Sequence, residues 1–177
     1  MIFLFRIISD ENPDFFRDLV ASGSDTFLDV HNVIQKELDY DPTQLASFFI
    51  TSANWEKERE ITLIDMIEEP GLTSLTMEQV TLDEHIKELN QRMLYLFDFF
   101  SERAFFIEMI EMSDELSRRE TPFIAHGNED PPPQLTVDLL MDDDPEPEEY
   151  DPLEDPDNLR IDDLDPDMFD SGMPEDF

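Results

Sequence analysis

The chain has 177 residues, of which 40% are hydrophobic, and its 46 acidic and 11 basic residues give a formal net charge of −35. This length suits one domain with an appendage better than two domains. The charge argues against direct binding to nucleic acid or to anionic membranes, because both depend on lysine and arginine to neutralise phosphate. The sequence has no cysteine, which excludes disulfides, thiolate catalysis and cysteine-ligated metals.

The chain begins with an apolar segment, Ile2–Ile8, that we interpret as a buried strand. The segment is interrupted by Arg6 and is too short for the core of a signal peptide. No run in the sequence approaches the ~18 apolar residues that a membrane helix needs. We therefore expect a cytoplasmic protein that does not span a membrane.

A turn signal at residues 11–13 precedes a second predicted strand, Phe15–Ala21. The next segment favours a helix, because its apolar stripe recurs every three or four residues. The positions of this stripe are Phe27, His31, Ile34 and Leu38. Asp25 or Thr26 is a suitable N-cap, since either side chain can accept a hydrogen bond from a first-turn N–H.

The second half of the domain contains four predicted strands and one short helix. Two segments rich in Phe and Ile, Ala46–Thr51 and Glu60–Asp65, are predicted strands. After a loop, Thr81–Leu89 is a predicted short helix that begins with a capping-box pattern. The last two strands, Arg92–Phe99 and Arg103–Met112, are expected to form a hairpin.

Together these elements predict an α+β domain, with two helices packed on one face of a mixed, mostly antiparallel sheet. The last two strands are nearly continuous apolar runs, and such strands tend to be covered on both faces. An extra strand, a second subunit or the C-terminal tail are the candidates to cover the other face. Trp55–Glu60 alternates in charge, which is typical of an edge protected against unwanted pairing.

The composition changes after about residue 120. Residues 127–177 contain 20 of the 46 acidic residues, nine of the 13 prolines and one basic residue, Arg160. Such a segment cannot bury enough apolar surface to offset the entropy lost on ordering. We therefore predict a domain over residues 1–120 and a disordered, acidic, proline-rich tail over residues 121–177.

The predicted tail contains apolar islands between its carboxylates. Acidic stretches with interspersed Leu, Met and Phe suit recognition by a basic, grooved partner on which they fold. The candidate partner-binding residues are Leu159, Ile161, Leu164, Met168 and Phe169. Two alternatives stay open at this stage: a tail that only confers solubility, and docking of Leu135–Met141 on an edge of the domain's own sheet.

Several segments carry motifs that occur together, and in the same order, in one known family. They are Pro13-Asp14-Phe15-Phe16-Arg17-Asp18-Leu19, Val30-His31-x-x-Ile34-Gln35, Tyr40, Gln44-Leu45-x-x-Phe48 and residues 94–108. These segments resemble the plasmid pRiA ORF-three-like family, whose members are also called TnpR-like passenger proteins of insertion elements. The resemblance covers about residues 1–112. It implies a small α+β fold of unestablished function.

The last motif of the family, Tyr-Asp-Phe-Gly-Asp-x-Trp-x-His, is only partly present. Asp98 and Phe99 match it, but Phe100-Ser101 replaces Gly-Asp, Arg103 replaces Trp and Phe105 replaces His. The polar cluster that could host chemistry in the family is therefore mostly absent. A serine recombinase also needs a nucleophilic serine ringed by arginines, and the sequence contains no such cluster.

No pattern predicts a catalytic, cofactor or metal site. The four glycines are far apart, which excludes a glycine-rich phosphate loop. The three histidines lack the spacing of a helical metal site, and we interpret His31 as a core histidine hydrogen-bonded to the backbone. The remaining candidate for acid–base chemistry is a pocket near Asp98, Glu102 and Arg103, for which the plainer interpretation is a surface ion pair at a strand end.

These observations favour a non-enzymatic accessory or protein-binding module, associated with a mobile element, whose acidic tail engages a basic protein partner. One alternative is a DNA mimic that occupies a nucleic-acid-binding protein, although mimicry needs charges on a rigid surface. Another is an enzyme that uses the pocket near Asp98, Glu102 and Arg103. The sequence implies no cofactor and leaves the oligomeric state open, including a homodimer through an exposed sheet face.

Overall fold

The computed structural model describes residues 1–65, 74–115, 117 and 119–135, which lie in the compact unit Met1–Thr136. A seven-stranded sheet forms the body of this unit, in the order β4-β3-β5-β6-β1-β2-β7. Neighbouring strands in this sheet pair antiparallel throughout. The predicted α+β class with a mostly antiparallel sheet is therefore confirmed. The tail predicted to be disordered, residues 121–177, is described up to residue 135 and includes a strand, whereas residues 136–177 lie outside the described ones.

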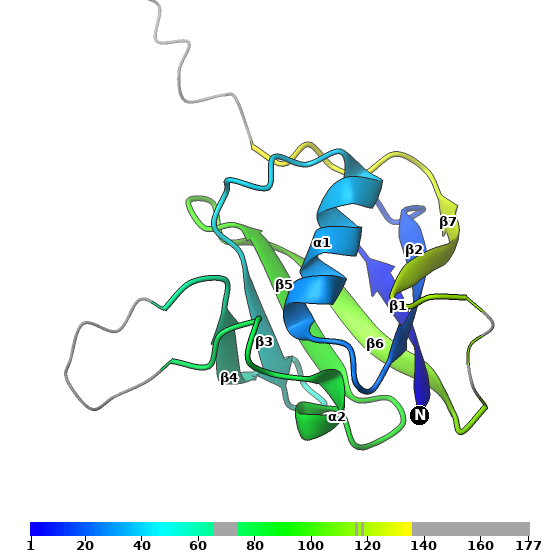
Figure 1. Cartoon of the computed structure of the whole chain (residues 1–177). Coiled ribbons are helices and arrows are strands. Elements are labelled where there is room, and N and C mark those ends of the chain that lie inside the picture. The colour runs from blue at the N-terminus through cyan, green and yellow to red at the C-terminus, as the bar shows by residue number, and fades with distance from the viewer. Residues whose placement is uncertain (66–73, 116, 118, 136–177) are drawn as a thin grey trace, which may run out of the picture. The chain divides into compact units, whose positions relative to one another are not determined.

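The nine described elements follow one another along the chain. The strands are β1 (Ile2–Ile8), β2 (Phe16–Ser22), β3 (Ser47–Thr51), β4 (Lys57–Thr62), β5 (Arg92–Asp98), β6 (Arg103–Ser113) and β7 (Phe123–Asn128). The helices are α1 (Phe27–Leu38) and α2 (Leu82–His85). Helix α1 lies across one face of the sheet (Figure 1).

Most predicted strands have the predicted bounds to within one residue at either end. Two elements differ more. Strand β4 begins at Lys57, three residues before the predicted start at Glu60, so most of the segment of alternating charge lies in an edge strand. Helix α2 ends at His85, because the backbone of Ile86 is already extended. The helix therefore has four residues and is shorter than the predicted segment Thr81–Leu89.

Helix α1 is fixed at both ends by its own sequence. The Thr26 hydroxyl accepts from the Asp29 N–H, and the Asp29 carboxylate accepts from the Thr26 N–H, so two otherwise unpaired donors are satisfied. Asp39 ends the helix in the left-handed region, with φ 54°. The buried face of the helix then packs on the sheet, where Phe27 contacts Phe48 ring to ring at 5.2 Å.

The two faces of the sheet differ because side chains alternate along each strand. On the face under α1, aromatic and branched side chains are fully buried; they include Phe3, Phe5, Phe48, Tyr95, Phe105 and Ile107. We call the opposite face, which α1 does not cover, the open face. On it Arg6 and Ile8 of β1 are exposed. The sequence predicted two helices on one face, and the long helix α1 covers one face of the sheet, whereas α2 is a single turn of four residues.

Strand β7 was not predicted, and it carries the sheet past residue 120, where the sequence analysis ended the domain. It pairs with β2 from Phe16↔Asn128 to Val20↔Phe123. A glycine and a histidine in six residues give a weak strand signal, and Pro122 directly precedes the strand. The compact unit continues to Thr136.

A polar cluster lies inside the core beneath α1. Gln35 Nε2 donates to the Tyr95 hydroxyl at 2.7 Å, and that hydroxyl lies 2.8 Å from His31 Nδ1. His31 is therefore a core histidine, but its partner is a tyrosine side chain rather than the backbone. Because the hydroxyl accepts from Gln35, its proton is free to point at a neutral imidazole nitrogen.

Burial lowers the pKa of His31 to about 4, whereas an unfolded histidine titrates near ~6.5. Between these values the unfolded chain binds the proton and the folded chain does not, so stability falls as the pH falls through this window. We expect the free energy of unfolding to drop by about 2–3 kcal/mol more in the parent than in His31→Gln between about pH 7 and pH 4.5. Urea unfolding of both proteins at both pH values measures this difference, and equal pH dependence would contradict it.

A second prediction concerns Gly127, which lies under the side chain of Arg17. A Cβ at this position would lie 2.5 Å from Arg17 Cδ, yet Arg17 is held by bonds from Nη1 to the carbonyls of Phe16, Asn128 and Glu129. Gly127→Val should therefore displace the guanidinium and cost about 1–3 kcal/mol in thermal or urea unfolding. In an Arg17→Ala background the same substitution should cost clearly less. An equal cost in both backgrounds would show that Arg17 is not the obstacle.

Candidate functional site

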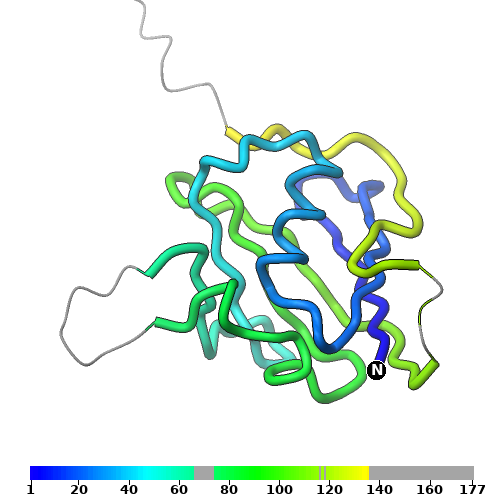
Figure 2. Tube along the Cα trace, in the orientation of Figure 1, coloured from blue at the N-terminus to red at the C-terminus, as the bar shows by residue number. Residues whose placement is uncertain are grey.

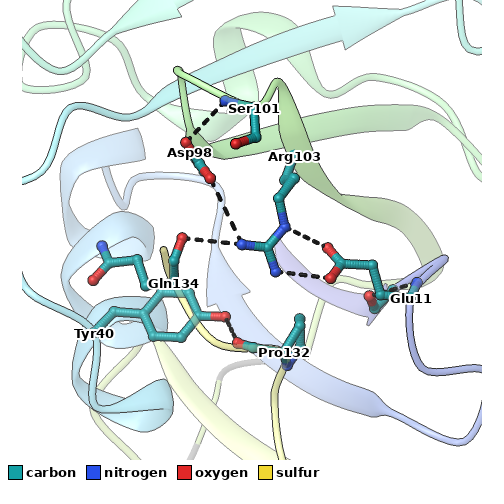
Figure 3. A network of polar contacts seen from close by, with 8 residues as sticks. Glu11, Tyr40, Asp98, Ser101, Arg103, Pro132 and Gln134 are labelled. Carbon is teal, nitrogen blue, oxygen red and sulfur yellow. Dashed lines mark hydrogen bonds and ion pairs between the residues drawn. The ribbon is translucent and has the colours of Figure 1, made fainter. Parts of the chain in front are cut away.

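Arg103, the first residue of β6, is the centre of a polar network, and its side chain is only 11% exposed. Its Nε and Nη2 donate to the two carboxylate oxygens of Glu11 at 2.8 and 2.7 Å. Its Nη1 lies 3.6 Å from Asp98 Oδ2 and donates to the backbone oxygen of Gln134 at 3.3 Å (Figure 3). The guanidinium also lies over the ring of Phe97, 5.1 Å from its centroid. The cation is thus paired on every side.

The structure brings together two of the three residues of the predicted enzyme pocket. Asp98 is 3% exposed, and its Oδ1 accepts from the N–H groups of Phe100 and Ser101, closing the β5–β6 turn. Its second oxygen faces Arg103. Glu102 is exposed in the same turn, with φ 53°, and makes no ion pair with either residue. The plainer sequence interpretation, an ion pair at a strand end, holds for Asp98 and Arg103, although the pair is buried rather than on the surface.

The same network fixes residues 128–134, which we call the anchored segment. The Tyr40 hydroxyl donates to the backbone oxygen of Pro132, which is buried. Gln134 bonds Asp41 twice, accepting from its N–H at 2.6 Å and donating to its carbonyl at 3.1 Å. Figure 2 shows this segment running beside the loop that follows α1. The chain is therefore held in place up to the last residues that the structure describes.

The other end of the anchored segment is also held by side chains. Asn12 donates to the Asp130 carbonyl at 3.4 Å, and Asn128 donates to the Asp14 carbonyl at 3.3 Å. Arg17, bound to the carbonyls of this segment, makes an ion pair with Glu37 of α1 at 3.2 Å. Side chain to backbone bonds suit this task because they hold a segment whose prolines have no N–H to donate.

A shallow groove of about 510 Å³ lies beside Arg103 on the open face. Its floor is apolar, formed by Phe49, Leu94, Leu96 and Phe106. Charged side chains line the rest of it: Asp10, Glu11, Lys57, Glu102 and Arg103. The groove can accept an apolar side chain or a small amphipathic group. Both carboxylate oxygens of Glu11 bind Arg103, so this pair is engaged in structure rather than free for acid–base work. The other two acidic residues of the groove, Asp10 and Glu102, are exposed.

The titration behaviour of the network agrees with a structural role. Burial raises the pKa of the Tyr40 hydroxyl, so it stays a donor at neutral pH. The hydrogen bond to Glu11 raises the pKa of Arg103, which stays charged. Neither group changes its protonation near pH 7. Across residues 1–65, 74–115, 117 and 119–135, no group of three or more acidic or histidine side chains is placed to hold a metal ion.

The candidate partner-binding residues Leu159, Ile161, Leu164, Met168 and Phe169 lie outside the described residues, as does most of Leu135–Met141. Within the described part, no helix is long and apolar enough to cross a membrane. Sequence reasoning missed Glu11, Tyr40 and Gln134 as partners of Arg103. The run Pro131-Pro132-Pro133 is the one signal in the sequence that points to this segment, and a proline run by itself does not predict which side chains bind its carbonyls.

Replacing Arg103 tests how much the anchor contributes. Arg103→Leu leaves the buried Asp98 carboxylate without its cation and frees Gln134, so we expect a loss of about 2–4 kcal/mol in urea unfolding. Hydrogen exchange at the Asp41 amide, which donates to Gln134, should also become faster. Arg59→Leu, which removes an exposed arginine of β4, is the matched control and should cost under about 0.5 kcal/mol. Equal losses in the two variants would refute the anchor.

Comparison with known proteins identifies the fold and the family. The structure is similar to the crystal structure of a protein of unknown function from Methanosarcina mazei Go1, with a TM-score of 0.60 and 18% sequence identity over 75% of this chain and 71% of that chain. This likeness shows a shared fold. No curated protein matches the sequence significantly. The plasmid pRiA4b ORF-3-like protein family matches residues 3–171, well beyond the residues 1–112 in which the motifs were found. The chain therefore belongs to the plasmid pRiA4b ORF-3-like family.

Proposed function

We propose that this protein is a non-enzymatic binding module whose domain presents an acidic segment, residues 137–177, to a basic protein partner. The observation that carries the proposal is the Arg103 network. In this network, the side chains of Arg103, Tyr40 and Gln134 hold the chain in place up to Gln134. The acidic segment begins three residues later.

The charge of the segment indicates the chemistry of the partner. Residues 137–177 contain 18 acidic residues and one basic residue. A basic surface would be attracted at long range, and the encounter would be steered electrostatically. The Leu, Ile, Met and Phe side chains among the carboxylates supply apolar contacts that a purely solvating segment does not need. The family is named after a plasmid reading frame, which agrees with a partner encoded by or acting on a mobile element.

A fixed starting point improves such binding. Because the chain is fixed up to Gln134 and not only up to the end of β7, fewer residues separate the acidic segment from the domain. Less conformational entropy is then lost when the segment binds a partner that also contacts the domain. The groove beside Arg103 offers such a second contact on the same side of the network. The arginine of the groove is already held by Glu11 and Asp98, which supports a structural role for it and favours binding over catalysis.

Affinity capture with three versions of the protein tests this proposal. The full chain is compared with a chain ending at Thr136, which keeps the anchored segment, and with a full-length variant in which Leu159, Ile161, Leu164, Met168 and Phe169 are all serine. We expect the full chain to enrich basic proteins, the shortened chain to lose them, and the serine variant to retain at most about a tenth of the signal at unchanged charge. Identical sets of captured proteins from all three would refute the proposal.

A further inference from the structure

A row of alternating charges crosses five strands of the open face. The cross-strand register pairs Arg92 with Glu108, Glu108 with Arg6, Arg6 with Asp18, and Asp18 with His126. The row therefore runs from β5 through β6, β1 and β2 to β7. We call it the charged row. Residues opposite each other in antiparallel strands have their side chains on the same face.

Two ion pairs already form within the charged row. Arg6 Nε and Nη2 bind both carboxylate oxygens of Asp18 at 2.8 and 2.9 Å, and Arg92 Nε binds Glu108 Oε2 at 2.9 Å. The arginines still face solvent, with 46% of the Arg6 side chain and 31% of the Arg92 side chain exposed. Each has donors left for a further carboxylate, because a guanidinium has five N–H groups.

An apolar row lies next to the charged row on the same face. The register pairs Phe49 with Leu94, Leu94 with Phe106, Phe106 with Ile8, and Ile8 with Phe16. Ile8 is 43% exposed, and Phe49, Phe106 and Phe16 are half-buried. Leu94 is buried, so the row is exposed in part. Partly exposed apolar side chains with charges beside them are typical of an interaction surface.

The two rows are self-complementary under a two-fold rotation. An axis parallel to the strands, midway between β6 and β1, exchanges Arg6 with Glu108 and Arg92 with Asp18. Two copies placed face to face about this axis would set each arginine of the charged row opposite a carboxylate of the other copy. The same rotation keeps positions along the strands, so the apolar row lies on itself. A surface that fits its own copy in this way is what an isologous dimer requires.

The shape of the open face, with a tryptophan side chain beside a hollow, also fits this two-fold axis. Trp55, from the turn between β3 and β4, lies edge-on to Phe106 with centroids 5.0 Å apart, and Arg92 lies over its ring. Beside it is a hollow of about 180 Å³ between β1 and β6, which is where the axis passes. The rotation brings Trp55 of the second copy to the Ile8 side of this hollow. Tryptophan and arginine are the residues that contribute most often to interface energy.

We propose that the open face is the interface of a symmetric homodimer, with the two-fold axis parallel to the strands between β1 and β6. Arg6 of each copy pairs with Glu108 of the other, whose side chain is 30% exposed. Arg92 lies opposite Asp18, whose side chain is 9% exposed and is paired with Arg6 of its own copy. Ile8 lies in the apolar centre. This inference is independent of the acidic segment and its partner. It assigns to a second copy the sheet face that one helix leaves uncovered.

Reciprocal charge reversal tests the axis directly. In Arg6→Glu alone, position 6 faces Glu108 of the other copy, and in Glu108→Arg alone two arginines meet, so each variant should be monomeric where the parent is a dimer. Mixed in equal amounts, the two variants should form a heterodimer, because both contacts are then between opposite charges. Sedimentation velocity measures the oligomeric state of the two single variants and of their mixture. The salt concentration is about 0.15 M, because electrostatic repulsion between the acidic chains is then screened beyond ~8 Å.

A second variant keeps the test decisive if a charge reversal disturbs the fold. Ile8→Asp replaces an exposed side chain at the centre of the interface and should weaken the dimer at least about tenfold. Leu89→Asp is the matched control, since Leu89 is 53% exposed and lies outside the open face; it should leave the dimer unchanged. A parent protein that stays monomeric at all concentrations would overturn the proposal. In that case, slow hydrogen exchange of the open-face residues in the monomer would show that residues of the same chain cover this face. A dimer that tolerates Ile8→Asp, or folded charge variants that stay monomeric when mixed, would also overturn it.

Discussion

The alternation of side chains along the strands is the constraint on which the rest of this structure depends. A seven-stranded sheet has two faces, and the single long helix α1 can bury only one of them. The open face still carries large rings, and cations lie over several of them: Arg6 over Phe16, Lys57 over Phe49 and Arg92 over Trp55. A charged head above an apolar ring lets that face meet water while remaining able to meet another surface.

The Arg103 network solves a different problem, which is how to attach a highly charged segment to a compact domain. Prolines 131–133 offer carbonyls but no N–H groups, so ladder pairing cannot hold them. Side-chain donors bind carbonyls of this segment instead: the Tyr40 hydroxyl binds that of Pro132, and Arg103 binds that of Gln134. A buried arginine is stable only when its charge is balanced, and Glu11 and Asp98 provide that balance.

These two features are the basis of the two associations that we propose. The anchored segment leads into the acidic residues that we propose engage a basic partner, and the open face fits a second copy of the chain. A dimer would present two acidic segments together, and two linked weak contacts bind more tightly than either alone.

The sequence by itself determined the class of the fold, the positions of helix α1 and six of the strands, and the change of composition near residue 120, because periodicity, capping and charge are local properties of the chain. It also placed Asp98 and Arg103 as an ion pair at a strand end. Strand β7, the charged row and the anchored segment were decided only by tertiary structure. Each depends on residues far apart in the chain, such as Arg103 with Glu11 or Asp18 with His126, and no local pattern records which strands become neighbours or in which register they pair.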